Sequence, residues 1–197
     1  MNIDQKIAVI IVNWKKHDFT LKCIESVLNS SYTNFKIILV DNECQNGVLD
    51  ELRKNEKIHI IKNENNEGFA RANNQGIRYS LKNGFDYVLL LNNDTVIKSD
   101  LLELLIKQSN NLNQKIIQPL ILNYDGSEIW NAGGTINNFF GTFRTLKKGE
   151  SFKNFKSISN FTNWFTGCCV LLKTEIFNDV GYFDERFFAY YEDVDFS

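Results

Sequence analysis

Two clusters of oxygen-bearing side chains lie far apart in the sequence, and their residue types suit cation binding and proton transfer. The first directly follows an apolar run and contains Asn92, Asn93 and Asp94. The second is a group of acids near the end of the sequence, Glu192, Asp193 and Asp195. A divalent cation that bridges the phosphates of a diphosphate takes hard oxygen ligands. A carboxylate in a cleft can also take a proton from an attacking hydroxyl group.

Each cluster also has a plain structural interpretation. Asn and Asp are favoured in the turns that follow strands, and taken alone the first cluster is best explained that way. Acids can stabilise helix N-termini, and we predict that role for Asp184 and Glu185. Carboxylates packed closely together raise one another's pKa or bind a cation, so Asp193 remains a candidate base.

Strands and helices must position these residues, and the first half of the sequence alternates between the two. Apolar runs predict four strands, at residues 7–12, 35–40, 57–61 and 87–91. Two of them, 7–12 and 87–91, are continuously apolar, which is typical of parallel strands covered on both faces. Helical patterns between the strands indicate βαβ units. Open α/β sheets bind ligands at the carboxyl ends of their strands, where the first cluster would lie.

Three helices are predicted: one that begins near Asp18, one over residues 68–82 and one over residues 101–108. Asp18 is placed to cap the first helix. Gly84 suits the left-handed residue that ends the second. Either Ser99 or Asp100 can cap the third, and Glu103 would complete a capping box with Asp100.

The second half of the sequence is less regular. Pro119 lies within the apolar stretch 116–122 and predicts a strand that is interrupted or at a sheet edge. Residues 133–163 carry no clear period and predict hairpins or a loop over the site. A further strand is expected at 168–172 and a short helix at 174–180.

Composition excludes some classes of function. The 22 basic and 24 acidic residues give a net charge of −2, which offers no electrostatic footprint for nucleic acid. No stretch approaches the roughly 20 apolar residues of a membrane-spanning helix, and the first apolar run is too short for a secretory signal. We therefore expect a cytoplasmic protein with no nucleic-acid partner, with peripheral association at the inner face of the membrane left open.

The four cysteines form no Cys-x-x-Cys pair: Cys23, Cys44, Cys168 and Cys169. Nearby histidines that could complete a zinc site are absent from the sequence around them. Adjacent residues on a strand face opposite sides, so Cys168 and Cys169 cannot easily pair. Free thiols in a reducing compartment are the simplest expectation.

Three further residues could contact a nucleotide. Asn13 and Asp41 follow the first two strands, at the crevice where a base and ribose would lie. Arg71 lies in the first turn of the second helix and could donate to a phosphate. Ordinary turn chemistry explains Asp41 equally well, and no Gly-x-Gly-x-x-Gly fingerprint surrounds Arg71.

Taken together, several motifs resemble a known family. They are Ile-Ile-Val-Asn-Trp at 10–14, Val-Asp-Asn at 40–42, the segment 66–76, Leu-Asn-Asn-Asp-Thr at 91–95 and the segment 181–195. In this order they resemble family 2 glycosyltransferases of the GT-A fold, and most of all the bacterial rhamnosyltransferase-like branch. The expected fold class is therefore α/β. It would have a Rossmann-like, mostly parallel sheet flanked by helices and a smaller irregular β region on the acceptor side.

The resemblance implies inverting transfer of a sugar from a nucleotide-diphosphate donor, such as a dTDP- or UDP-sugar, to a glycan or lipid-linked acceptor. Asp94 matches the last acid of the Asp-x-Asp motif and would hold Mg²⁺ or Mn²⁺, and Asp193 matches the catalytic base. The implied donor-binding residues are Asn13, Asp41, Arg71, Asn74, Asn92 and Asn93. The implied acceptor-side residues are Gly167, Cys168 and Glu192.

Two departures from the family pattern matter. Asn92 replaces the first acid of the Asp-x-Asp motif, and the chain stops at Ser197, where relatives continue through a helix. We expect one domain over 1–197, with a nucleotide-sugar-binding half at 1–98 and an incomplete acceptor-side half at 99–197. The alternative is an inactive nucleotide-sugar-binding remnant. A sugar-nucleotide pyrophosphorylase is disfavoured because residues 13–17 contain no glycine.

Overall fold

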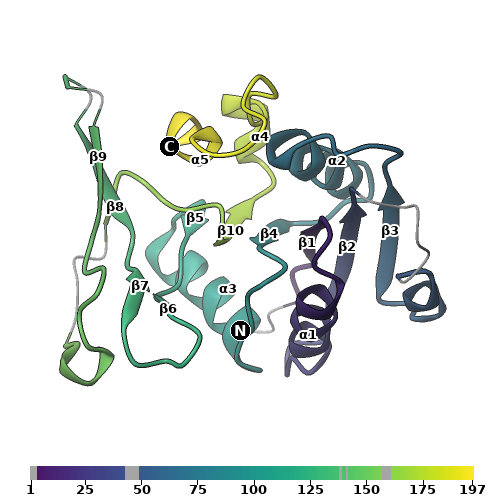
Figure 1. Cartoon of the computed structure of the whole chain (residues 1–197), viewed down its shortest axis with the longest axis horizontal. Helices are drawn as coiled ribbons and strands as arrows, with labels where there is room; N and C mark the ends of the chain where they lie inside the picture. The colour runs from purple at the N-terminus through teal and green to yellow at the C-terminus, as the bar shows by residue number, and fades with distance from the viewer. Residues whose placement is uncertain (1–3, 43–48, 138, 141, 157–160) are drawn as a thin grey trace.

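The computed structural model describes residues 4–42, 49–137, 139–140, 142–156 and 161–197 (Figure 1). The elements of the first half are β1 (Ile7–Asn13), α1 (His17–Leu28), β2 (Phe35–Asp41), η1 (Asp50–Lys54), β3 (Ile58–Lys62), α2 (Phe69–Lys82) and β4 (Tyr87–Leu91). Those of the second half are α3 (Leu101–Leu112), β5 (Ile116–Ile117), β6 (Ile121–Leu122), β7 (Ile129–Asn131), β8 (Gly134–Asn137), β9 (Thr142–Thr145), η2 (Phe152–Asn154), β10 (Cys169–Lys173), α4 (Ile176–Val180) and α5 (Glu192–Phe196).

A mixed six-stranded sheet organises the molecule, in the order β3-β2-β1-β4-β10-β5. The first four of these strands are parallel, and β10 is antiparallel to both of its neighbours. Asn13 at the end of β1 lies opposite Asp41 of β2, and Cys169 at the start of β10 lies opposite Leu91 at the end of β4. The predicted α/β class and all four predicted parallel strands are confirmed.

Helices cover both faces of the sheet, because successive residues of a strand point to opposite sides. Ile7, Val9 and Ile11 of β1 belong to the core shared with α1 and α3. Ala8 and Ile10 belong to the core shared with α2 and α4. Figure 1 shows α1 and α3 on one side of the sheet, with α2, α4 and α5 on the other. Strands buried on both sides explain why their sequences are continuously apolar.

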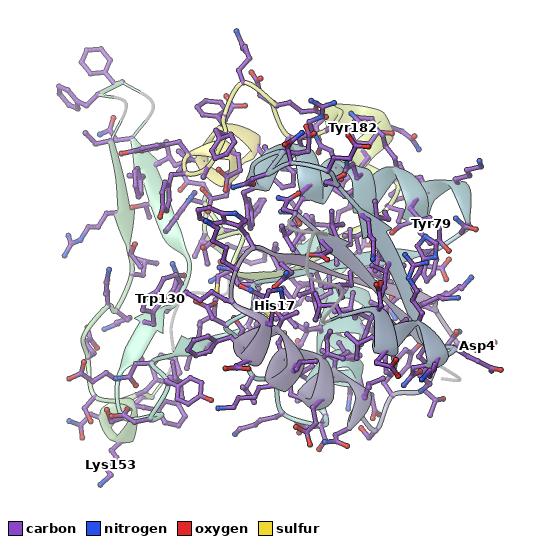
Figure 2. All side chains as sticks on the ribbon, turned by 45° about the vertical axis from the view of Figure 1, so that its right-hand side comes forward. Asp4, His17, Tyr79, Trp130, Lys153 and Tyr182 are labelled. Carbon is purple, nitrogen blue, oxygen red and sulfur yellow. The ribbon has the colours of Figure 1, made fainter. Side chains whose placement is uncertain are left out.

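The irregular β region predicted for the second half is also confirmed. Pro119 separates β5 from β6, two strands of two residues each that belong to different sheets. β6 pairs with β7, and β8 pairs with β9 as a hairpin. This region stands beside the main sheet, and Figure 2 shows Trp130 of β7 and Lys153 of η2 within it.

Two predicted helix caps are wrong. α1 begins one residue before Asp18, which therefore lies inside the first turn. Asp100 precedes α3 in a helical conformation, φ −91° and ψ −4°, and its side chain makes no capping hydrogen bond. A capping side chain needs the extended backbone typical of the N-cap, so no capping box forms.

Helix C-termini follow their predicted chemistry more closely. Gly84, with φ +65°, follows α2 as expected, and Gly181, with φ +82°, follows α4. α3 runs to Leu112, beyond the predicted end at residue 108, because the left-handed residue is Asn113. No helix within the described ranges is long and apolar enough to cross a membrane.

Gly76 allows α2 to pack closely on β1. A Cβ added at Gly76 would lie 2.7 Å from Cγ2 and 2.9 Å from Cδ1 of Ile10. We predict that Gly76→Ala lowers the free energy of unfolding. The overpacking cost of about 1–3 kcal/mol exceeds the gain in helix propensity of roughly 1 kcal/mol. Urea unfolding followed by circular dichroism measures this difference.

The double variant Gly76→Ala/Ile10→Ala provides the control. Its loss of stability should be smaller than the sum of the two single losses, because removing the Ile10 side chain relieves the clash. Purely additive losses would contradict the predicted contact.

Candidate functional site

Two consecutive residues before β10 join the two oxygen-rich clusters. The Gly167 amide donates a hydrogen bond of 3.0 Å to Oδ2 of Asp193. The Cys168 carbonyl accepts a hydrogen bond of 2.8 Å from the amide of Asn92. Because β10 is antiparallel to β4, its start lies at the carboxyl end of β4. Residues about 100 positions apart in the sequence are thereby held at one edge of the sheet.

The loop after β4 offers two hard oxygen donors. Oδ1 of Asn92 is enclosed and has no hydrogen-bond partner among the described residues. Asp94 is exposed, and its charge contributes to the raised pKa of the Cys23 and Cys168 thiols, which places it near them. No group of three His, Cys, Asp or Glu side chains suited to a metal occurs within the described ranges. An Asp carboxylate and an unpaired amide oxygen fit Mg²⁺ or Mn²⁺ if a diphosphate and water supply the other ligands.

A buried network links the carboxyl ends of β1 and β2 to that loop. Nδ2 of Asn13 donates to Oδ1 of Asp41 at 2.8 Å, and the Thr20 hydroxyl donates to Oδ1 of Asn13 at 2.7 Å. Asn93 then donates to the Thr20 hydroxyl at 2.9 Å. Three predicted donor-binding residues therefore belong to one hydrogen-bonded chain. Sequence reasoning missed Thr20, which is fully buried in α1, because its partners are distant in the sequence.

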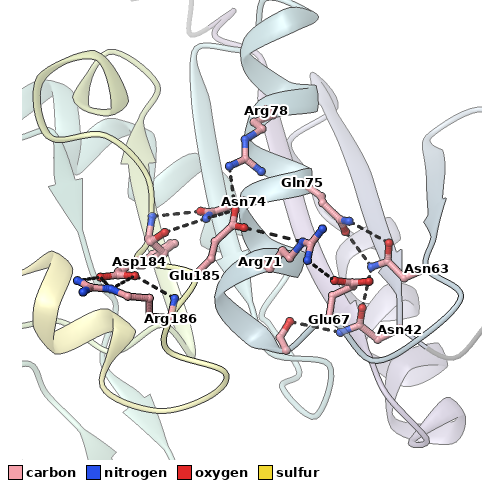
Figure 3. Close-up of polar contacts among 12 residues, drawn as sticks. Asn42, Asn63, Glu67, Arg71, Asn74, Gln75, Arg78, Asp184, Glu185 and Arg186 are labelled. Carbon is pink, nitrogen blue, oxygen red and sulfur yellow. Dashed lines mark hydrogen bonds and ion pairs between the residues drawn. The ribbon is translucent and has the colours of Figure 1, made fainter.

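A second amide network connects the ends of β2 and β3 to α2 (Figure 3). Asn63 donates to Asn42 at 2.7 Å and exchanges hydrogen bonds of 2.8 and 2.9 Å with Gln75. Asn42 also donates to Asn66 at 3.1 Å. The position of Asn63 directly after a strand was the available sequence signal for this network.

Arg71 and Asn74 lie where α2 meets the segment before α5 (Figure 3). The Arg71 guanidinium pairs with Glu67 at 2.8 Å and more distantly with Glu185 at 3.8 Å. Asn74 is fully buried, and its amide hydrogen-bonds the backbone N–H and C=O of Phe183 and the carboxylate of Glu185. Both side chains are engaged with protein partners, and their donor-binding roles stay predictions.

The helix-capping role predicted for Asp184 and Glu185 is wrong, because no helix begins at this point. The Asp184 carboxylate instead pairs with the guanidinium of Arg186 and accepts a hydrogen bond from the backbone amide of Arg186. Glu185 accepts from Asn74 and then from Arg78, and these hydrogen bonds lower the pKa of its carboxyl group.

The N-terminus of α2 is hydrogen-bonded to the segment that precedes α5. The Phe69 amide donates to the Phe188 carbonyl at 2.6 Å. A Cβ at Gly68, which has φ +81°, would lie 2.5 Å from that carbonyl oxygen. The glycine therefore admits the backbone of Phe188.

The two adjacent acids Glu192 and Asp193 differ in their surroundings. Burial raises the pKa of Asp193, against the lowering effect of its bond from Gly167. Glu192 is 95% buried, since only 5% of its surface is exposed, and Oε2 has no partner among the described residues. Burial, and secondarily the charge of Asp193, raises the Glu192 pKa. A carboxylate with a raised pKa is a stronger base when ionised, so Asp193 is suited to proton transfer.

The described cysteines are free and buried, as predicted: Cys23, Cys168 and Cys169. Burial raises the pKa of Cys23 to about 12 and that of Cys168 to about 11. These thiols are protonated at neutral pH and are not nucleophiles. Cys168 therefore contributes to the site through its carbonyl group and through a 3.6 Å contact of its sulfur with Thr95. Cys44 lies outside the described residues.

Comparison with known proteins finds similar glycosyltransferases. The low-salt glycan biosynthesis hexosyltransferase Agl10 of Haloferax volcanii is 35% identical over 96% of this chain and 60% of its own length. The dTDP-rhamnosyl transferase RfbF of Shigella flexneri is 28% identical over 98% of this chain and 62% of its own length. The chain thus spans about three fifths of the length of these relatives.

A solved structure shares the fold at low sequence identity. The crystal structure of GalNAc-T7 with UDP, GalNAc and Mn²⁺ superposes with a TM-score of 0.77, at 16% identity, over 100% of this chain and 40% of that chain. The sequence model of the family described as Glycosyl transferase family 2 matches residues 8–181. The chain belongs to glycosyltransferase family 2 and has its GT-A fold, as the motifs in its sequence predict.

Proposed function

We propose that the chain transfers a sugar from a nucleotide-diphosphate sugar to a hydroxyl acceptor, with inversion, in the synthesis of cell-surface polysaccharide or glycan. The observation that carries this proposal is the junction at Gly167 and Cys168, which holds Asp193 and Asn92 at the same sheet edge. A base and a diphosphate-binding loop must lie close together for direct displacement at the sugar.

Donor binding would use the buried network at the ends of β1 and β2. Asp41 can accept a hydrogen bond from the base or ribose, and Asn13 fixes its orientation. Asn93 connects this network to the loop that would hold the diphosphate. A UDP- or dTDP-sugar is the proposed donor, since UDP is bound in the GalNAc-T7 structure and RfbF is a dTDP-rhamnosyl transferase. Arg71 would reach the donor only by leaving Glu67, and Asn74 would support the segment at 183–185.

Asp94 and Asn92 would hold Mg²⁺ or Mn²⁺ together with the diphosphate. The metal would neutralise negative charge on the departing nucleoside diphosphate. The unpaired Oδ1 of Asn92 supports this assignment, because a buried acceptor without a partner is costly until a ligand satisfies it. Asn92 also brings no charge to a site whose metal must bind an anionic diphosphate.

Asp193 would act as the base. Its carboxylate would take the proton of the acceptor hydroxyl as that oxygen attacks the sugar carbon from the side opposite the diphosphate, which inverts the configuration. Gly167 orients the carboxylate through its amide. Gly167, Cys168 and Glu192 would line the acceptor side, next to the base.

The proposed division places donor binding in residues 1–98 and acceptor binding in residues 99–197. The acceptor would be a glycan or a lipid-linked glycan. Cytoplasmic location and contact with the inner face of the membrane remain part of the proposal. Phe139 and Phe140, 88% and 72% exposed at the β8–β9 hairpin, are the apolar side chains that such contact would use.

The alternative function is a nucleotide-sugar-binding remnant without turnover, which would bind the donor through the same network of Asn13, Asp41 and Asn93. Calorimetry with UDP or dTDP and Mn²⁺, run beside a donor-hydrolysis assay, separates the two functions. Binding accompanied by hydrolysis or transfer supports the transferase, whereas binding alone supports the remnant.

Asp193→Asn is predicted to lower transfer or donor hydrolysis by about 10²–10⁴-fold while nucleotide binding is unchanged, because only proton transfer is lost. In the wild type the rate should fall as the pH is lowered through the raised pKa of Asp193. A panel of nucleotide sugars with Mn²⁺ provides the assay. Asp195→Asn, an exposed acid of the same helix, is the control that should keep activity.

The same variant makes a prediction about stability. Because folding raises the Asp193 pKa, this group contributes stability that is present below its unfolded pKa and lost as the pH rises through its folded pKa. Asp193→Asn should therefore be at least as stable as the wild type at neutral pH. A large loss in melting temperature at pH 7 would show that the Asp193 carboxylate stabilises the fold, and would contradict its assignment as a residue kept for catalysis.

Asp94→Ala is predicted to weaken Mn²⁺-dependent nucleotide binding by at least about tenfold, since the metal would lose its carboxylate ligand. Binding is measured by calorimetry with Mn²⁺ and again with a chelator. The matched control is Asp100→Ala, an exposed acid after the same loop whose side chain caps nothing. Equal binding by both variants would remove the proposed metal site.

Thr20→Val is predicted to lower the free energy of unfolding by about 1–3 kcal/mol, because Asn13 and Asn93 each lose a buried partner. Nucleotide binding should weaken as Asp41 loses its fixed support. Thr33→Val, an exposed loop substitution, serves as the control. Unchanged binding in a destabilised Thr20→Val protein would confine the network to a structural role.

A further inference from the structure

Three aromatic side chains from separate parts of the chain meet beside the proposed base. The Phe143 ring lies 5.2 Å from the Trp164 ring and 5.8 Å from the Tyr191 ring, measured between centroids. We call these three residues the aromatic platform. Phe143 is 41% exposed and Tyr191 59% exposed, whereas Trp164 is only 6% exposed. The accessible Phe143 ring thus contacts both the buried Trp164 ring and the accessible Tyr191 ring.

Two short segments connect the platform to Asp193. Tyr191 directly precedes α5, in which Asp193 is the second residue. Trp164 lies three residues before Gly167, whose amide holds the Asp193 carboxylate at 3.0 Å. A group that rests on the platform would therefore lie close to the base.

The platform is built with close contacts and backbone strain. A Cβ at Gly134 would lie 1.9 Å from Cε3 of Trp164, so the indole packs directly on the β8 backbone. Tyr190 and Tyr191 both have φ of 70°, a region that is costly for residues other than glycine. Such strain persists where the surrounding structure enforces it, and it gathers at ligand sites.

Unpaired polar atoms flank the platform. Nε1 of Trp164 and Oε2 of Glu192 are both enclosed without a hydrogen-bond partner among the described residues. One is a donor and the other an acceptor when ionised, and a sugar hydroxyl can serve either one. Aromatic surfaces with a few polar groups are typical of small-molecule sites.

We propose that the aromatic platform binds a sugar ring of the acceptor in the corner between the nearly perpendicular rings of Phe143 and Tyr191, with its attacking hydroxyl toward Asp193. The inference rests on the proposed function and adds to it the residues that bind the acceptor and the part of the acceptor that they recognise. The acceptor group recognised here is a carbohydrate ring and not a lipid chain. Phe143 and Tyr191 contact the acceptor, and Trp164, against which Phe143 packs, is the positioning residue.

The test uses the full chain labelled with ¹⁵N, with UDP or dTDP and Mn²⁺ present. Methyl glycosides of rhamnose, glucose, galactose and N-acetylglucosamine are titrated, and the indole N–H signal of Trp164, assigned with Trp164→Phe, is followed by NMR. At least one glycoside should shift this signal. Phe143→Ala and Tyr191→Ala should each raise its Kd by about tenfold. Phe152→Ala, which removes an equally exposed ring at 40%, should leave the Kd unchanged.

Nucleotide binding, measured by calorimetry, separates failure of this inference from failure of the proposed function. It should be the same in wild type and platform variants, which also shows that the variants fold. Nucleotide binding without a response to any glycoside overturns this inference alone. A Trp164 shift caused by decyl phosphate and by none of the glycosides assigns the platform to a lipid chain and likewise overturns it. Absence of nucleotide binding in the wild type overturns the proposed function instead.

Discussion

The antiparallel pairing of β10 with β4 is the constraint on which the site depends. Parallel strands deliver Asn13, Asp41 and the loop after β4 to one edge of the sheet. A strand running the opposite way begins at that same edge, so the residues before β10 meet the residues after β4. The Gly167 amide and the Cys168 carbonyl then face two different partners, Asp193 and Asn92. Two backbone groups thus fix the distance between a candidate base and a candidate metal loop.

Residues 183–197 are held by α2 as well as by the contact between Gly167 and Asp193. α2 receives the Phe188 carbonyl at its N-terminus, binds Phe183 through Asn74 and pairs Arg78 with Glu185. The Asn74 bonds are buried, where loss of a partner is costly, whereas the ion pair is half exposed and contributes little. The amide of Asn74 is therefore the stronger anchor. Residues 183–197 are held from both the sheet edge and the helix layer.

The sequence predicted what depends on local pattern. Apolar runs predicted the four parallel strands, and the Asn/Asp triplet predicted the edge of the sheet where the candidate site lies, because burial and turn formation depend on neighbouring residues. Thr20 was missed because its partners come from β1 and from the loop after β4. The caps assigned to Asp18 and Asp100 failed because capping depends on the φ and ψ of one residue, which residue type alone does not determine. The pairing of Arg71 with Glu185 likewise required the arrangement of α2 against residues 183–197, whereas its pair with Glu67 is a local i,i+4 contact.

Buried polar atoms without a partner lie close to the junction at Gly167 and Cys168, where the two oxygen-rich clusters meet. Among the described side chains, those of Asn92, Glu192 and Trp164 each have a buried polar atom that makes neither a hydrogen bond nor an ion pair. Asn92 bonds to Cys168, Glu192 adjoins Asp193, and Trp164 lies three residues before Gly167. Each such atom costs roughly 1–3 kcal/mol if it stays unsatisfied, and buried polar groups elsewhere in proteins are nearly always paired. A fold that leaves three of them around one two-residue junction is less stable there than it could be, and a ligand rich in hydroxyl and phosphate oxygens, together with its cation, would remove that cost.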